Sequence, residues 1–173
     1  DELPYAFNPP EGYIVTANNA VVGPEYPYSI SRQWSYGQRA QAIVDMLENA
    51  PGPISTESII EMQGNNRMLI AEDLLPILMA ISFEEDTLQE ARDIFNGWDY
   101  QMDIDSAPAA LFAVFWKNLL SATFEDDLPE DHWLSGGDNC MEIVRQLSKL
   151  PTSTWWDNQA TVETESRDVI FTL

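Results

Sequence analysis

Residues 8–19, NPPEGYIVTANN, contain the one run in this chain whose pattern is typical of a β-strand. The run, Tyr13–Ala17, is mostly apolar and leads into two adjacent asparagines, Asn18 and Asn19. A strand normally pairs with other strands, and a run this short cannot form a sheet alone. Because the rest of the chain carries no second strand pattern, the sequence predicts a mainly α fold with a single short strand.

The residues around this run are irregular, and the residues after them are helical in pattern. Five prolines fall within residues 1–35, where they interrupt any regular element. From Gly37 onward, apolar residues recur at the spacing of a helix face. We therefore divide the chain into an irregular segment, 1–35, which contains the strand, and a helical domain, 36–173.

Helical spacing and cap residues predict several helices within that domain. The helix over 109–120 is apolar nearly all round and should be the most deeply buried. Residues 125–137 are expected to form a long loop. Three further helices are predicted in the first half of this domain: one after Gly37, one that begins at Ser55 or Thr56, and one over roughly 66–81 with a kink or break at Pro76. Another begins at a capping box formed by Asp86 and Gln89. The last two run from Cys140 to Leu150 and from Thr161 or Thr164 onward, the latter with Val169–Phe171 as its apolar residues.

Composition excludes several partners. The 173 residues include 8 basic and 29 acidic side chains, which give a formal net charge of −21. Such a charge repels nucleic-acid phosphates and anionic membrane surfaces.

The single cysteine, Cys140, excludes an internal disulfide. No apolar run approaches the roughly 20 residues of a membrane span. No signal-peptide pattern opens the chain, so we expect such a peptide to be absent or already removed.

Neither the acidic clusters nor the single histidine forms a recognisable metal or catalytic motif. Residues 99–105 contain three aspartates, but a calcium loop needs glycine at its sixth position and glutamate at its twelfth, and these are missing. Residues 105–108 instead favour a helix N-cap followed by proline. His132 lies beside Asp131 in an acidic loop without a nucleophile-turn pattern. One histidine and one cysteine cannot form a closed four-ligand metal shell.

The paired asparagines allow two interpretations. A side-chain amide presents an uncharged N–H donor pair, which suits the stabilisation of a developing oxyanion. Alternatively, an asparagine can end a strand by bonding its own backbone in an Asx-turn. Composition alone favours the Asx-turn.

The whole stretch closely resembles a segment of the penicillin acylase (penicillin amidase) family, in which Asn-Pro-x-x-Gly-Tyr-Ile leads to an Asn-Asn pair. This family of N-terminal nucleophile hydrolases includes acyl-homoserine-lactone acylases, and the segment lies in its large chain. Later stretches resemble later family segments in the same order, although each is less specific: WSYGQRAQAIVDML, ISTESIIEMQGNN, AEDLLPIL, WDYQMDIDSAPAALF and TWWDN.

The resemblance implies that this chain is a piece of the large chain of an αββα N-terminal nucleophile hydrolase. Asn18 matches the side-chain donor of the family's oxyanion hole, and Arg39 matches an arginine that supports the active site. Asn19 is then expected to be structural. The nucleophile, a serine that self-cleavage exposes as a new N-terminus, would lie outside this chain. The parent enzyme would cleave N-acyl amide bonds, and the isolated piece would be inactive.

The implied partners are the remainder of the acylase, meaning its small chain and the nucleophile-bearing part of its large chain, and a small N-acyl substrate. The resemblance implies no cofactor or metal ligand in this piece, allows calcium elsewhere in the parent, and suggests a periplasmic or secreted location. The alternative from another class is a non-catalytic α-helical interaction module, with Trp155 and Trp156 at a partner groove.

Overall fold

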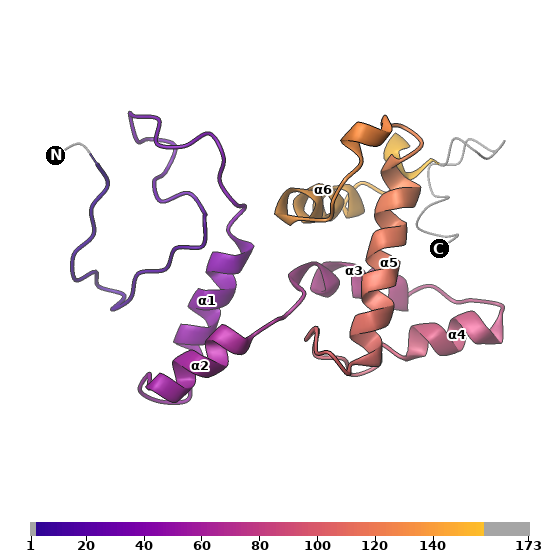
Figure 1. The fold of residues 1–173 in the computed structure, drawn as a ribbon, viewed down its shortest axis with the longest axis horizontal. Coiled ribbons are helices and arrows are strands. Elements are labelled where there is room, and N and C mark those ends of the chain that lie inside the picture. Colours follow the sequence, from indigo (N-terminus) through magenta and orange to yellow (C-terminus); the bar gives the residue numbers. More distant parts are fainter. Residues whose placement is uncertain (1–2, 158–173) are drawn as a thin grey trace. The chain divides into compact units, whose positions relative to one another are not determined.

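The fold is mainly α-helical in a computed structural model that describes residues 3–157 (Figure 1). Within that range the chain forms six α-helices and two short 3₁₀ turns, and it contains no β-strand. The chain divides into two compact units, 1–65 and 66–173, each of which is considered by itself. The division between the units therefore falls after the first two helices and not before them. The helix expected after Thr161 or Thr164 lies outside the described residues.

The first unit consists of a long irregular segment followed by two helices, α1 (Gln38–Glu48) and α2 (Thr56–Gly64). Gly37 precedes α1 with a φ of 87°, a left-handed conformation that glycine adopts without steric strain. Ser55 caps α2, because its side chain accepts a hydrogen bond from the backbone N–H of Ser58. The Ser58 hydroxyl bonds back to the N–H of Ser55 and completes a capping box. Both helices begin where their sequence signals predict.

The strand predicted over Tyr13–Ala17 is not present. The nearest paired residues are Asn19 and Ser35, which form an isolated parallel bridge. Ser35 donates its backbone N–H to the carbonyl of Asn18 at 2.7 Å. A strand requires a ladder of such bonds, and no described backbone group pairs with residues 13–17 in that way. The prediction of a strand was therefore wrong for the part of the chain that the structure describes.

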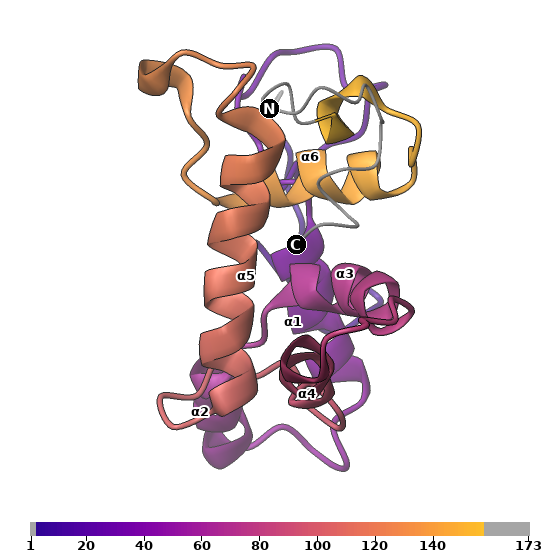
Figure 2. The same ribbon diagram turned by 90° about the vertical axis from the view of Figure 1, so that its right-hand side faces the viewer.

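The second unit contains α3 (Leu69–Met79), α4 (Asp86–Asp93), α5 (Ala107–Phe124) and α6 (Asp138–Ser148), with 3₁₀ turns at Glu130–His132 and Thr154–Trp156. Helix α3 packs against α4 and α6, and α5 packs against the second 3₁₀ turn. Figure 2 shows α5 as the long helix, with α3, α4 and α6 to its right. These helices enclose one apolar core, whose fully buried members include Ile70, Phe112, Val144 and Trp156.

Helix α5 begins as its sequence indicates, but it is buried along one face and not all round. Ser106 caps it by accepting a hydrogen bond from the N–H of Ala109, and Pro108 lies in the first turn, where no N–H is needed. One face enters the core through Phe112, while Val114 on another face is 58% exposed. The helix is also long and apolar enough for a membrane span, a property that core helices share, and 39% of it is buried inside the protein.

Two local features of the second unit differ from what the sequence suggested. Of the kink or break expected at Pro76, the break is absent, because α3 continues to Met79. Pro76 is exposed, and it lacks the N–H that would bond to the carbonyl of Glu72 in a regular helix. At α4, Glu85 takes the N-cap position without a side-chain cap bond. Gln89 does not close the predicted box, because its amide donates to Asp93 within the helix instead.

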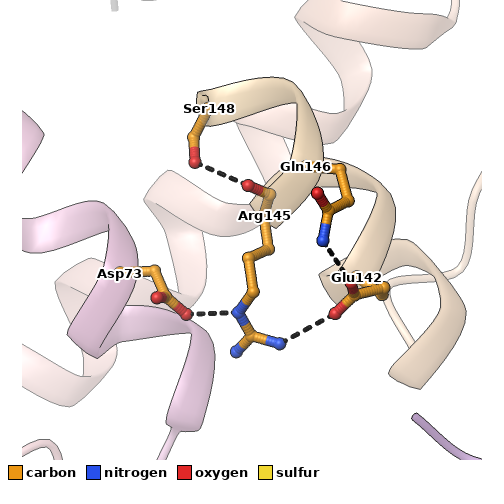
Figure 3. A network of polar contacts seen from close by, with 5 residues as sticks. All are labelled: Asp73, Glu142, Arg145, Gln146 and Ser148. Atoms are coloured by element: carbon orange, nitrogen blue, oxygen red, sulfur yellow. Dashed lines mark hydrogen bonds and ion pairs between the residues drawn. The ribbon is translucent and has the colours of Figure 1, made fainter. Parts of the chain in front are cut away.

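Helices α3 and α6 are also joined by a polar network around Arg145 (Figure 3). The guanidinium donates to Asp73 on α3 at 2.6 Å and to Glu142 on α6 at 3.0 Å. Gln146 donates to the same Glu142 carboxylate at 2.6 Å. The Arg145 side chain is only 14% exposed, so its two carboxylate partners compensate for its removal from water.

Candidate functional site

The candidate site is formed by the irregular segment and α1, both within the first unit. Its entry is a tight turn at Pro9–Gly12, where the N–H of Gly12 donates to the carbonyl of Pro9 at 3.0 Å. Gly12 has a φ of 79°, which explains why glycine stands at this position. The chain then runs through Tyr13 to the paired asparagines.

Asn19 uses its side chain to hold the turn. Its Oδ1 accepts the backbone N–H of Ala17 at 3.0 Å, and its Nδ2 donates to the carbonyl of Ala20 at 3.0 Å. Both ends of the amide are therefore engaged by neighbouring backbone, and Ala17 beneath it is buried. The local backbone bonding that composition suggested for the pair is made by Asn19.

Asn18 has a different environment. Its φ is 64°, a left-handed conformation that asparagine tolerates better than most residues. Its carbonyl accepts the N–H of Ser35, so the backbone on both sides of the residue is fixed. Its side chain is exposed and takes no part in the turn. The two asparagines therefore have different roles: the side chain of Asn19 stabilises the turn, and the side chain of Asn18 extends from it.

Arg39 sets the orientation of the Asn18 amide. This residue lies in the first turn of α1 and donates through Nη2 to Asn18 Oδ1 at 3.3 Å. A guanidinium can only donate, so the amide atom that faces it must be the oxygen. The Nδ2 group then points away from Arg39, and among residues 3–157 it has no hydrogen-bond acceptor. The two residues that the sequence singled out, 21 positions apart, are therefore in contact.

A second contact between this segment and α1 was not predicted from the sequence. The hydroxyl of Tyr13 donates to Glu48 Oε1 at 2.6 Å. The hydrogen bond with Glu48 raises the pKa of Tyr13, and burial and the charges of Glu48 and Glu11 add to the increase. The phenol is consequently protonated at neutral pH and acts as the donor. No spacing rule connects residues 35 positions apart, so only the placement of a charged residue at the end of α1 could have drawn attention to Glu48.

Three of the other residues considered as candidates from the sequence, Asp99, Asp103 and His132, make local contacts in loops. Asp103 accepts a hydrogen bond from Asn66 and links two loops, whereas Asp99 accepts one from the backbone of Gln101 within its own loop. His132 is an exposed loop residue whose Nδ1 lies 2.9 Å from Asp131. All of these residues belong to the second unit, whereas Asn18 belongs to the first.

The two tryptophans differ in their exposure, and Trp155 is 36% exposed. Trp156 is 1% exposed and donates its indole N–H to the carbonyl of Leu150 at 3.1 Å. Trp155 packs its ring on Phe124, with the two ring centroids 5.4 Å apart. Both rings thus serve the packing of the second unit.

The chemistry available at the site follows from these contacts. The site presents an uncharged N–H donor whose backbone is fixed and whose amide orientation is set by a cation. Such a group can stabilise negative charge that develops on an oxygen atom without having to reorganise. It cannot act as a nucleophile or a base, because an amide nitrogen has no available lone pair.

Comparison with known proteins identifies the family. The penicillin amidase family matches residues 1–173. Acyl-homoserine lactone acylase QuiP of Pseudomonas fluorescens is 27% identical over 96% of this chain, and QuiP of Pseudomonas aeruginosa is 28% identical over 94% of it. The chain spans only 23% and 22% of the lengths of these two relatives. Because the family match extends over all 173 residues, this chain belongs to the penicillin amidase family.

Proposed function

We propose that this chain supplies the oxyanion-hole donor of an amidohydrolase that cleaves N-acyl amide bonds. The observation that carries the proposal is the contact between Asn18 and Arg39, which leaves the Nδ2 group directed away from the arginine. Membership of the penicillin amidase family supplies the reaction class. The similarity to acyl-homoserine lactone acylases makes an N-acyl substrate the natural choice.

In the proposed reaction, the α-amino group of an N-terminal serine outside this chain takes the proton of the serine hydroxyl, whose oxygen attacks the amide carbonyl, and the carbonyl oxygen becomes an oxyanion. Asn18 Nδ2 donates a hydrogen bond to that oxygen. Arg39 holds the amide oxygen of Asn18 and prevents the amide from flipping. The positive charge of Arg39 also polarises the amide, which makes Nδ2 a stronger donor. The chain alone performs no turnover, because it contributes the donor and not the nucleophile.

The proposed partner of the first unit is the remainder of the same enzyme. Several large apolar side chains of its irregular segment are highly exposed, including Leu3, Tyr5 and Phe7 at 77%, 83% and 79%. Apolar groups exposed in this number usually mark a surface that packs against another part of a protein. A chain that spans 22–23% of its relatives' lengths is consistent with such a covering surface. No comparable observation favours the interaction module, since Trp156 is buried in the core and Trp155 packs on Phe124.

The test uses the full-length protein that contains this chain and compares three substitutions. Asn18→Ala removes the donor, and Asn18→Asp keeps an oxygen for Arg39 but replaces the donor with an anion. Each should lower kcat for an N-acyl substrate by about 10²–10³-fold while self-cleavage still occurs. The matched control is Asn139→Ala, an exposed asparagine of α6, which should leave kcat unchanged. Wild-type turnover by both Asn18 variants would exclude the oxyanion assignment.

A further inference from the structure

We propose that α1 holds the oxyanion donor rigidly in place. Tyr13 and Glu48 are positioning residues, because their contact fixes the segment that leads to Asn18. This inference rests on the proposed function, because it concerns how the same donor is held. Neither residue touches the proposed reacting atoms. Their effect is transmitted through the four residues between Tyr13 and Asn18.

The first support is that α1 is attached to this segment at both of its ends. Arg39 in the first turn contacts Asn18 at 3.3 Å, and Glu48, the last helical residue, contacts Tyr13 at 2.6 Å. The contacts pair an earlier residue of the segment with a later residue of the helix, so the two run in opposite directions. A segment held at one point can pivot about it, whereas a segment held at two points cannot.

The second support is that the two spans match in length. Nine helical steps separate Arg39 from Glu48, which corresponds to about 13.5 Å along the helix axis. Five steps separate Tyr13 from Asn18, and a fully extended chain of five steps covers about 16.5 Å. The chain bend at Ala17 shortens the real span towards that of the helix. Both contacts can therefore be made at the same time without distorting either element.

The third support is the charge order of α1, which opposes the helix dipole. A helix is stabilised by acidic groups at its start and basic groups at its end. Helix α1 has no acidic residue in its first turn and no basic residue in its last turn. It instead carries Arg39 at the start and Glu48 at the end. Helix stability does not explain this arrangement, whereas the two contacts with the segment explain both charges.

The fourth support is the chemistry of the Tyr13 contact. A carboxylate that accepts from a neutral hydroxyl forms a short, charge-assisted hydrogen bond, in agreement with the 2.6 Å distance. A phenol keeps its proton in the neutral range at its ordinary pKa of about 10, and the raised pKa of Tyr13 acts in the same direction. Loss of this bond would release the start of the segment and leave Asn18 held by the Arg39 and Ser35 contacts alone.

The experiment compares kcat and KM in the full-length protein. Tyr13→Phe removes only the hydroxyl, and Glu48→Ala removes only the acceptor. Each should lower kcat by about tenfold with little change in KM, because misplacement of a donor affects the transition state more than substrate binding. Glu48→Gln keeps an acceptor oxygen and should restore most of the loss. The double variant Tyr13→Phe/Glu48→Ala should be no worse than either single variant, because all three lack the same bond.

The matched control is Asp45→Ala, which removes a carboxylate from the same helix that bonds to Gln41 and not to the segment. It should retain wild-type kcat. Positioning is excluded if Tyr13→Phe keeps wild-type kcat while Asn18→Ala loses it, and the proposed function then stands. If the Asn18 variants also keep wild-type turnover, the proposed function fails as well. A rise in KM with unchanged kcat, or no rescue by Glu48→Gln, would also overturn the inference.

Discussion

The two units of this chain are stabilised in different ways. In the second unit, four helices surround a continuous core of apolar side chains. In the first unit, the buried apolar residues are Ala17 and Ala40, both small, and the other described members of the buried apolar set lie in the second unit. The first unit relies instead on specific polar contacts, such as those of Asn18 with Arg39 and Tyr13 with Glu48.

Because of this difference, the stability of the fold is expected to depend on the second unit and the proposed chemistry on the first. A packed core depends on the fit of many side chains, so the loss of one side chain is felt through the whole unit. A segment held by a few hydrogen bonds responds to the loss of one bond locally. Substitutions in the second unit are therefore expected to change unfolding, and substitutions in the first unit to change turnover.

The largest expected effect is at the centre of the second core. Phe112 is fully buried and contacts the rings of Phe95, Trp98 and Phe115. Phe112→Ala should lower the free energy of unfolding by about 3–5 kcal/mol, because it leaves a cavity among these rings. Chemical denaturation of the full-length protein would measure the loss. Val114→Ala, on the exposed face of the same helix, should cost much less.

The same variant tests whether stability and chemistry are separate. At a temperature where Phe112→Ala is still folded, its kcat should equal that of the wild type. A large loss of kcat in the folded variant would show that the core and the site are coupled, and the comparison between the units would no longer hold.

The next largest effect is expected at Arg39, in the first unit. Arg39→Met should lower kcat by about 10–30-fold, which corresponds to about 1.4–2 kcal/mol, because the Asn18 amide is then free to flip. Arg39→Lys should lose less, since it retains a donor and a charge. Arg32→Met is the matched control, because Arg32 is an exposed arginine of the same unit. Equal losses for Arg39→Met and Arg32→Met would point to net charge and not to orientation.

The sequence predicted the helices better than their details. The apolar spacing located α1 to α6, and helix starts were correctly expected at Ser55 or Thr56 and within residues 105–108, because caps and periodicity are local properties. The box at Asp86 failed because Gln89 has a competing partner one turn later. The strand at Tyr13–Ala17 failed because strand pairing depends on distant residues, which local patterns do not specify.

The candidate site was likewise predicted only in part. Family resemblance selected Asn18 and Arg39, and the structure places them in contact. Composition could not separate Asn18 from Asn19, because the two side chains are chemically identical and only the backbone conformation distinguishes them. Tyr13 and Glu48 were missed because their contact depends on how the segment folds back along α1.

A smaller effect is expected at the polar link between α3 and α6. Arg145→Met should lower the free energy of unfolding by about 1 kcal/mol at neutral pH, because Asp73 and Glu142 lose their shared partner. Lys117→Met removes an equal charge from an exposed position of α5 and should have little effect. Thermal unfolding at matched ionic strength would compare the two variants.

The pH dependence of this link has a definite sign. The hydrogen bond from Gln146 lowers the pKa of Glu142 below 4.5, burial opposes this, and the hydrogen bond and charge of Arg145 add to the lowering. A carboxyl group whose pKa is lower in the folded state stabilises the fold above its unfolded pKa. That stability is lost as the pH falls through the folded pKa. The difference between wild type and Arg145→Met should therefore shrink below pH 4.5, and a difference that grows there would contradict this origin.

The smallest expected effect is at the start of α2 in the first unit. Ser55→Ala removes the oxygen that accepts the N–H of Ser58 and should destabilise the helix by about 0.5–1 kcal/mol. Because no described residue of α2 is buried, the loss should be confined to that helix. Hydrogen exchange should accelerate for the amides of α2, while the unfolding midpoint of the second unit stays constant. A shift of that midpoint would mean that the first unit, despite its small buried set, contributes to the stability of the second.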